Sequence, residues 1–364
     1  MEKEVISNRQ FMQLLAIISI ATTILYVPQS LTATTGRDGW LFIFIFGLFG
    51  CINIMLFIVL ERLFPGKSFF HINRIVFGRF IGGLFNFAYI FYFIDLCTWV
   101  MREFTDFFLI TIEPSTPFSV FLIVAIVLSS YVVFHGMEVL SRMNEVIFFI
   151  TFCAYLILCL LLVNQYHPEY LLPILENGLL EPLKFWAVPT SFFGDAFIVC
   201  MFINHVRKTK HTPVYAVIGM LLAILLSCIL VLVSTMTLGA ETTEKLTYPT
   251  LSLIRNINIA NFVDRIDMFV VTIWMLGIFI KFSFYFMGSV YGLSEVLSIK
   301  NHRWLILPIA LCMFIHTKFK VSSLVQLSTI YNVKPWYFQT FQLYLPILIL
   351  LVALIVRKRM SKQP

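Results

Sequence analysis

The chain has 364 residues, of which 60% are hydrophobic and only 12% charged, and it carries a formal net charge of +7. Soluble domains contain about 25% charged residues, so this chain has too few charges to cover the surface of a soluble fold. Its mean hydropathy of +0.91 indicates an integral membrane protein, and long uncharged runs indicate membrane helices rather than a β-barrel. The Lys and Arg residues lie in many short connections, unlike the basic stripe of a nucleic-acid-binding protein.

Ten apolar stretches approach the length of about 20 residues that a helix needs to cross a bilayer. We therefore predict an all-α membrane protein with about ten transmembrane helices, in one domain over residues 1–364. In chain order, the predicted spans are residues 10–31, 40–60, 80–101, 118–135, 145–163, 184–204, 213–237, 268–291, 303–316 and 341–356.

The distribution of positive residues predicts the topology. With the amino terminus in the cytoplasm, 16 of the 26 Lys and Arg residues fall in or beside cytoplasmic segments and 8 in outer segments. Positive residues in short loops stay on the cytoplasmic side, so we expect both termini in the cytoplasm. The first ten residues lead into the first span without a small-residue cleavage site, and we expect no removable signal peptide.

Small and hydroxylated residues interrupt two of the spans. The first span contains the run Ser19–Leu25 with Pro28 a turn later, and the sixth contains the run Pro189–Asp195. Such runs allow a helix to unwind and present backbone groups to a small polar ligand, as in many secondary transporters. The alternative for each is a kinked helix that packs tightly against its neighbours.

The two interruptions lie five helices apart and run in opposite directions across the membrane. This arrangement is typical of an inverted repeat of five plus five helices. The repeats would cover roughly residues 10–163 and 184–316, followed by a further helix at residues 341–356.

Two ionisable residues lie near the middle of apolar spans, Asp195 in the sixth and Lys281 in the eighth. Because an isolated ion in hydrocarbon costs a few kcal/mol or more, each should pair with the other, with water or with a ligand. Lys281 is also a candidate for a fixed positive charge at the place where a sodium-coupled transporter holds its cation. A purely structural ion pair is the alternative.

In the third span, Asp95, Trp99, Arg102 and Asp106 share one helical face. By the length of the span, Arg102, Glu103 and Asp106 are expected at the membrane interface, on a solvated or snorkelling face. Asp95 lies deeper and is the member that we retain as a candidate pathway residue.

Residues 239–267 separate the seventh and eighth spans and become amphipathic, with Leu251, Ile254, Ile257, Ile259 and Phe262 among polar residues. A short helix lying on the outer face fits this pattern, and a plain connecting loop is the alternative.

The sequence contains no recognisable catalytic constellation. A Gly-rich phosphate loop, an HExxH motif and a nucleophile elbow are absent from it, and its seven cysteines lie singly in apolar runs. We therefore expect neither an enzyme nor a bound metal or cofactor.

Two stretches resemble a known family. Residues 6–28, ISNRQFMQLLAIISIATTILYVP, are similar to the first helix of amino acid permeases of the amino acid–polyamine–organocation superfamily. Residues 248–251, YPTL, followed by residues 259–267, IANFVDRID, and Trp274 resemble the signature ahead of helix eight in spore germination permeases. These are the GerAB-like B subunits of nutrient germinant receptors.

The resemblance implies a fold like that of leucine transporters, with a germinant site between broken first and sixth helices. It also implies a complex in the spore inner membrane with an A subunit and a lipoprotein C subunit, and a nutrient ligand such as an amino acid, sugar or nucleoside. The candidate ligand-binding residues that follow from it are Thr22, Thr23 and Ile24 in the first helix and Ser191, Phe192, Gly194 and Asp195 in the sixth.

One difference from the family concerns the ligand. Many permeases have a Gly-rich run where this chain has Ala21, Thr22 and Thr23, so the ligand class stays open. We expect a germinant receptor subunit that binds a small nutrient, most simply an amino acid, and signals germination. An amino acid/proton symporter acting alone is the alternative, whereas the paired interruptions and midspan charges disfavour a scaffold without a ligand.

Overall fold

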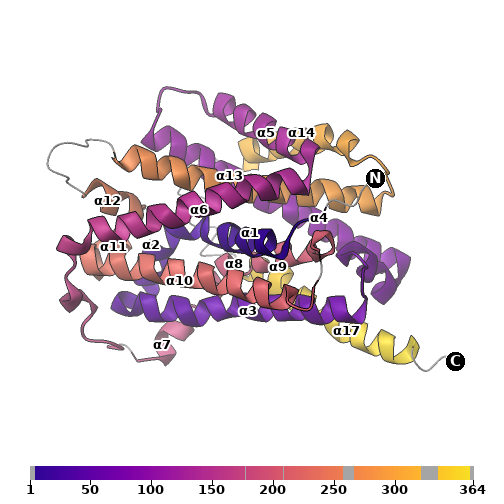
Figure 1. Ribbon diagram of the computed structural model, residues 1–364, viewed down its shortest axis with the longest axis horizontal. Coiled ribbons are helices and arrows are strands. Elements are labelled where there is room, and N and C mark those ends of the chain that lie inside the picture. Colours follow the sequence, from indigo (N-terminus) through magenta and orange to yellow (C-terminus); the bar gives the residue numbers. More distant parts are fainter. Residues whose placement is uncertain (1–4, 177, 208, 257–265, 321–334, 361–364) are drawn as a thin grey trace.

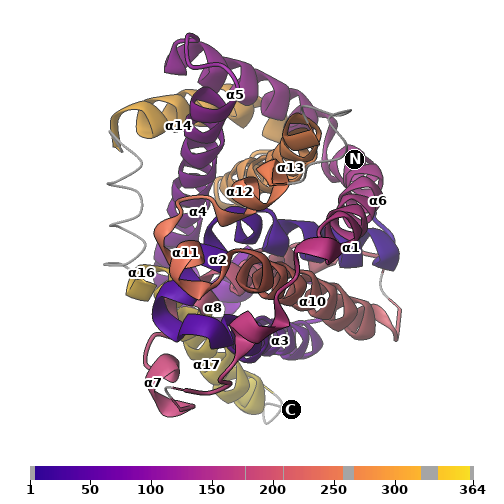
Figure 2. The ribbon, with the colours of Figure 1, turned by 90° about the vertical axis from the view of Figure 1, so that its left-hand side faces the viewer.

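The computed structural model describes residues 5–176, 178–207, 209–256, 266–320 and 335–360, which form a bundle of helices along one common axis (Figures 1 and 2). The first half contains α1 (Asn8–Ile20), α2 (Thr23–Thr35), α3 (Gly39–Leu63), α4 (Phe69–Thr111), α5 (Phe118–His135) and α6 (Met137–Leu161). The second half contains α7 (Leu180–Leu183), α8 (Ala187–Phe193), α9 (Ala196–Met201), α10 (Thr212–Leu238), α11 (Ala240–Lys245), α12 (Pro249–Arg255), α13 (Ile266–Val296), α14 (Ile306–Lys320), α16 (Pro335–Gln339) and α17 (Leu345–Met360). A π-helical turn, Thr340–Tyr344, joins the last two.

All ten predicted spans overlap helices, and the prediction of an all-α membrane fold with interrupted first and sixth segments is confirmed. Seven stretches of the described chain are long and apolar enough to cross a membrane. The other predicted spans contain shorter helices, since α1 has 13 residues, α14 has 15, and the sixth span is divided into α8 and α9.

α4 extends beyond its predicted span at both ends, and a glycine bends it near its start. Gly78 has φ +80° and ψ 176° and separates a first leg that begins at Phe69 from the membrane-crossing leg. Two asparagines hold this corner, since Asn73 Nδ2 donates to Asn86 Oδ1 at 2.8 Å and Asn86 Nδ2 donates to the carbonyl of Phe70 at 2.8 Å. The positive φ explains why glycine occupies the bend.

The segment between the seventh and eighth spans forms two short helices, α11 and α12, rather than the single surface helix that we expected. Leu251 and Ile254 of α12 are buried against the bundle, as their apolar character predicts. Ile257, Ile259 and Phe262 lie outside the described residues.

The two interrupted segments form the centre of the bundle. Every residue of α1 from Gln13 to Ile20 is buried, and so is every residue of α9. Helices that are apolar all round belong in an interior, whereas α3, α5 and α6 carry many of the large exposed apolar side chains of a lipid-facing surface. An isolated β-bridge between Ile6 and Val206 ties the start of α1 to the segment after α9.

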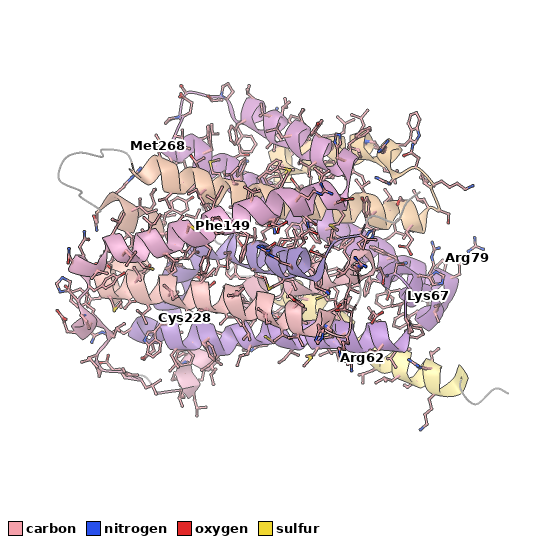
Figure 3. All side chains as sticks on the ribbon, viewed as in Figure 1. Arg62, Lys67, Arg79, Phe149, Cys228 and Met268 are labelled. Atoms are coloured by element: carbon pink, nitrogen blue, oxygen red, sulfur yellow. The ribbon has the colours of Figure 1, made fainter. Side chains whose placement is uncertain are left out.

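Several positive side chains lie at one end of the bundle. Arg62, Lys67 and Arg79 are found near the end where α17 finishes, and Met268 lies at the opposite end (Figure 3). This grouping agrees with the predicted assignment of these positive residues to one side of the membrane.

Candidate functional site

The first helix is interrupted between α1 and α2, but the interruption is short. Ala21 and Thr22 lie between the two helices and keep right-handed helical angles (φ −56°, ψ −40° and φ −91°, ψ −23°). Thr23 and Ile24, which the resemblance placed in the unwound part, instead form the first turn of α2. The backbone at Ala21 and Thr22 leaves the regular helical hydrogen-bond pattern but does not become extended. α2 therefore begins directly afterwards, at Thr23.

Side chains replace the backbone partners at this interruption. Pro28 has no N–H to donate to the carbonyl of Ile24, and that carbonyl accepts a bond of 2.5 Å from Thr250 Oγ1. The carbonyl of Ala21 accepts a bond of 2.6 Å from Trp274 Nε1. Both donors belong to the signature residues ahead of and within helix eight, so those residues stabilise the interrupted first helix.

The sixth segment is interrupted at Gly194 and Asp195, between α8 and α9. The amide of Phe197 donates to the carbonyl of Gly194 and that of Ile198 to the carbonyl of Asp195, each at 3.0 Å. Bonds between residues three apart form a tighter turn than an α-helix. Ser191 and Phe192 lie in the last turns of α8, and Ser191 Oγ donates to the carbonyl of Ala187 at 2.7 Å.

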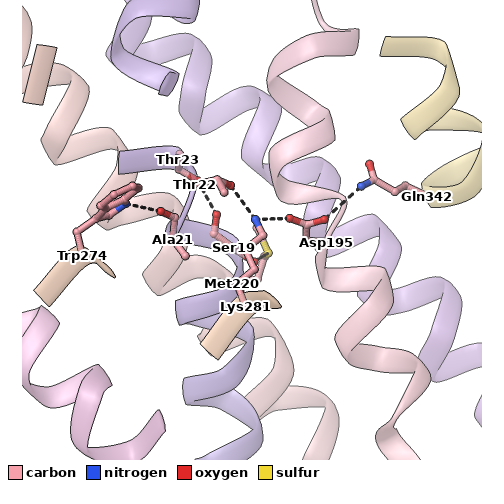
Figure 4. Close-up of polar contacts among 9 residues, drawn as sticks. All are labelled: Ser19, Ala21, Thr22, Thr23, Asp195, Met220, Trp274, Lys281 and Gln342. Atoms are coloured by element: carbon pink, nitrogen blue, oxygen red, sulfur yellow. Dashed lines mark hydrogen bonds and ion pairs between the residues drawn. The ribbon is translucent and has the colours of Figure 1, made fainter. Parts of the chain in front are cut away.

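A buried ion pair lies between the two interruptions (Figure 4). Lys281 Nζ, from α13, is 2.7 Å from Asp195 Oδ2, and it donates to Thr22 Oγ1 at 2.7 Å. The exposed fractions of the Lys281 and Asp195 side chains are 2% and 7%. The sequence left open whether each ion pairs with the other, with water or with a ligand. In the structure Lys281 and Asp195 pair with each other, and Thr22 connects the pair to the first helix.

Two glutamines from the last membrane segment complete the site, and the sequence interpretation missed both. Gln342 Nε2 donates to Asp195 Oδ1 at 3.4 Å, and Gln339 Nε2 donates to Thr190 Oγ1 at 2.8 Å and to the carbonyl of Ala187 at 3.0 Å. Within the described residues, the buried Oε1 atoms of both glutamines have no hydrogen-bond partner. The signal in the sequence was a pair of glutamines, three residues apart, in an otherwise apolar segment.

A small cavity of about 20 Å³ adjoins the ion pair. A space of this size holds about one water molecule, so it is too small for a nutrient molecule. Four of the seven candidate ligand-binding residues line the cavity together with Lys281: Thr22, Ser191, Phe192 and Asp195. The other three, Thr23, Ile24 and Gly194, are not among its lining residues.

Asp95 lies beside this site rather than in it. Its Oδ2 accepts a bond of 3.2 Å from Trp99 Nε1, and the indole of Trp99 lines the cavity. Its Oδ1 is 3.8 Å from His316 Nε2, and His316 Nδ1 is 2.9 Å from Thr98 Oγ1. The side chain of His316 is 25% exposed, so these residues join the cavity to a partly accessible imidazole.

The prediction of a solvated face for Arg102, Glu103 and Asp106 was wrong, since Glu103 is also fully buried. Arg102 Nε donates to Asp106 Oδ2 at 2.6 Å, and each side chain is 11% exposed. The guanidinium also lies 4.3 Å from the centroid of the Phe118 ring. α4 continues to Thr111, past the end of the predicted span, which places both residues inside the helix and against α5.

Among the described residues, no three His, Cys, Asp or Glu side chains gather in the way that a metal site requires. The central site therefore offers one cation, one carboxylate and several hydroxyl and amide groups, which can form ionic contacts and hydrogen bonds.

Two spore germination proteins are similar in sequence to this chain over most of its length. Spore germination protein KB of Bacillus subtilis (strain 168) is 29% identical, and the match covers 100% of this chain and 98% of that protein. Spore germination protein B2 of the same organism is 26% identical, over 85% of this chain and 86% of that protein.

A solved structure shows the same fold. Mhp1, a nucleobase-cation-symport-1 family transporter in a closed conformation with bromovinylhydantoin bound, superposes with a TM-score of 0.62. The superposition covers 91% of this chain and 75% of that chain at 12% identity, so it shows the fold alone. That fold is the leucine-transporter type. The family model described as spore germination protein matches residues 5–323, and the chain therefore belongs to the spore germination permease family.

Proposed function

We propose that this protein is the B-type membrane subunit of a spore nutrient germinant receptor, and that it binds a small nutrient between its two interrupted helices. The observation that carries the proposal is the buried pair of Lys281 and Asp195, which joins α13 to the sixth segment and, through Thr22, to the first. Buried ionisable groups inside a membrane protein mark functional pathways more often than packing.

The charges of the pair favour a zwitterionic ligand, such as an L-amino acid. A ligand that separates Lys281 from Asp195 must supply a partner to each, because an uncompensated buried charge costs about 3–5 kcal/mol. A ligand carboxylate would pair with Lys281 and accept a hydrogen bond from Thr22. A ligand ammonium group would pair with Asp195 and donate a hydrogen bond to the buried Oε1 of Gln342. A sugar or nucleoside offers no such pair of charges.

Because the cavity of about 20 Å³ is too small for a nutrient, the protein must open before a nutrient enters. Opening would separate Lys281 from Asp195 and move α13 relative to the interrupted helices. A ligand that binds the opened arrangement more tightly shifts the population toward it by its differential affinity. In a receptor, that shift is the signal that the partner subunits detect.

The assembly and the orientation are parts of the same proposal. The A subunit and the lipoprotein C subunit would be its partners, in the spore inner membrane, with both termini in the cytoplasm. Residues 10–163 and 184–316 would be the inverted repeats, followed by the helix at residues 341–356. The family membership and the grouping of Arg62, Lys67 and Arg79 at one end of the bundle support this assignment.

The test is germination of spores that lack this gene. Wild-type, deleted and complemented spores are exposed to a panel of L-amino acids, nucleosides and sugars, and release of dipicolinic acid is measured. We expect selective loss of the response to one or more L-amino acids and its recovery on complementation. In spores whose other receptor genes are deleted, an unchanged response to the whole panel would contradict the proposal.

A second candidate function is an amino acid/proton symporter acting alone. Asp95, which accepts a hydrogen bond from Trp99 and lies 3.8 Å from His316, favours it, because titratable groups that lead from a binding cavity are typical of proton relays. Uptake of a labelled amino acid into vesicles that contain only this protein separates the two functions. Accumulation driven by a proton gradient would support the symporter.

A further inference from the structure

An apolar groove lies away from the central site, between α5 and α14. It has a volume of about 690 Å³. The two helices run side by side at one edge of the bundle (Figures 1 and 2). The groove is lined by Ile123, Ile126, Val127, Ser130, Tyr131, Phe134, Arg303, Ile306, Leu307, Ala310, Leu311 and Phe314. Almost all of these side chains are apolar, so the groove suits a hydrocarbon chain.

A single positive charge lies in this lining. The guanidinium carbon of Arg303 is 4.3 Å from the centroid of the Phe134 ring. In the described ranges, no carboxylate lies within 4.0 Å of this guanidinium. Arg303 therefore holds an accessible charge at the groove, where an anion could replace water as its partner.

The neighbouring residues place this charge at the level of lipid head groups. Trp304 follows Arg303 in the chain and is 78% exposed. Tryptophan is enriched where the hydrocarbon core meets the polar head groups. A phosphate at that level would reach Arg303 while an attached acyl chain extended along the groove toward Phe314.

The size of the lining side chains favours a lipid over a partner helix. Helices that pack together in membranes present Gly, Ala, Ser and Thr, which allow their backbones to approach closely. Only Ser130 and Ala310 of the lining residues are of this kind, and the others are large aliphatic or aromatic side chains or Arg303. A flexible chain fills such an uneven groove better than a rigid helix.

From these observations we infer that the groove between α5 and α14 binds an anionic glycerophospholipid, with its phosphate at Arg303 and one acyl chain along the lining. The bound lipid packs the edge of the bundle where α5 meets α14.

The test is native mass spectrometry of the purified full chain with phosphatidylglycerol or phosphatidylcholine of identical acyl chains. We expect preferential retention of phosphatidylglycerol. Arg303→Gln should weaken that retention about fivefold, because it removes the charge-assisted hydrogen bonds between the guanidinium and the phosphate in the groove. The control is Arg79→Gln, an exposed arginine of α4 that does not line the groove, which should leave retention unchanged.

A second variant tests the acyl chain. Leu311 is 55% exposed and lines the groove, so Leu311→Trp fills the groove from a position that tolerates a larger side chain. It should reduce retention of both lipids while the melting temperature stays near that of the wild type. Equal retention of the two lipids by the wild type, or wild-type retention in both variants, would overturn the inference. If Leu311→Trp leaves lipid retention unchanged but prevents a partner subunit from co-purifying out of spore membranes, a helix occupies the groove instead and the inference is overturned.

Discussion

Lys281 and Asp195 form an ion pair of 2.7 Å that is almost completely buried and lies between the interruptions of the first and sixth helical segments. Thr22 contacts the Lys281 side of the pair and Gln342 the Asp195 side. The pair therefore connects four helical segments of the bundle: the interrupted first and sixth, the eighth and the last. Any ligand that enters here must compete with it.

The first prediction concerns the stability of this pair. Lys281→Met or Asp195→Asn should each lower the free energy of unfolding by about 3–5 kcal/mol, because each leaves a buried polar or charged partner without its counterpart. The double variant should lose less than the sum of the two, since neither ion is then stranded. Thermal unfolding in detergent measures these effects.

The matched control is Arg142→Met. Arg142 and Glu138 form a pair of 2.5 Å on α6, but their side chains are 71% and 46% exposed. Exposed pairs contribute about 0–1 kcal/mol, so this variant should unfold near the wild-type temperature. If the buried and exposed variants lose equal stability, the pair is not buried as described.

The second prediction concerns the close approach of Gly194 to Gln342. A Cβ at Gly194 would overlap Oε1 and Cδ of Gln342, so Gly194→Ala must displace that glutamine from Asp195. We expect spores with this variant to need a different nutrient concentration for half-maximal dipicolinic acid release. The control is Gly83→Ala on α4, where a Cβ meets nothing within 4 Å. An unchanged dose response in assembled Gly194→Ala receptor would exclude Gln342 from the site.

The third prediction concerns the support of the first interruption by Thr250. Thr250→Val keeps the shape of the side chain but removes the donor to the carbonyl of Ile24. A buried carbonyl left without a donor costs about 1–3 kcal/mol, and the melting temperature should fall accordingly. Thr272→Val is the control, because Thr272 Oγ1 donates within its own helix to the carbonyl of Met268 and the residue is exposed. Equal melting temperatures for the two variants would contradict this role.

The fourth prediction concerns Asp95. Asp95→Asn removes the charge beside His316 but keeps an acceptor for Trp99 Nε1. We expect nutrient affinity to change little, because Asp95 does not line the cavity, and the pH dependence of the response to change. Asp106→Asn, which alters the separate pair with Arg102, is the comparison. An identical pH profile in wild type and Asp95→Asn would remove Asp95 from any pathway.

Sequence reasoning named some of the residues that the structure gathers around the buried ion pair, but not all of them. Two ions in apolar spans required partners, and the runs of small residues marked the places where helices are interrupted, so Thr22, Asp195 and Lys281 could be identified. The predicted last span began at residue 341 and so excluded Gln339. The π-helical turn Thr340–Tyr344 also changes the helical register, which hydrophobic periodicity does not reveal.

Errors at the ends of helices had a different cause. The predicted third span ended at residue 101, whereas α4 continues to Thr111, because Arg102 and Asp106 neutralise each other against Phe118. Charges usually mark the end of a membrane span, but a charge with an internal partner does not. Thr23 and Ile24 begin α2, where Thr250 donates to the carbonyl of Ile24 that Pro28 leaves without a donor, and Trp274 donates to the carbonyl of Ala21.

The most direct test of the central claim is equilibrium binding to the purified protein in lipid nanodiscs. A panel of labelled L-amino acids is compared with their methyl esters, which lack the carboxylate, and their N-acetyl derivatives, which lack the ammonium group. We predict that at least one amino acid binds, and that both of its derivatives bind about 100-fold more weakly or worse, since each strands one buried charge. Equal affinity for an amino acid and its derivatives, or binding of uncharged sugars alone, would contradict the account.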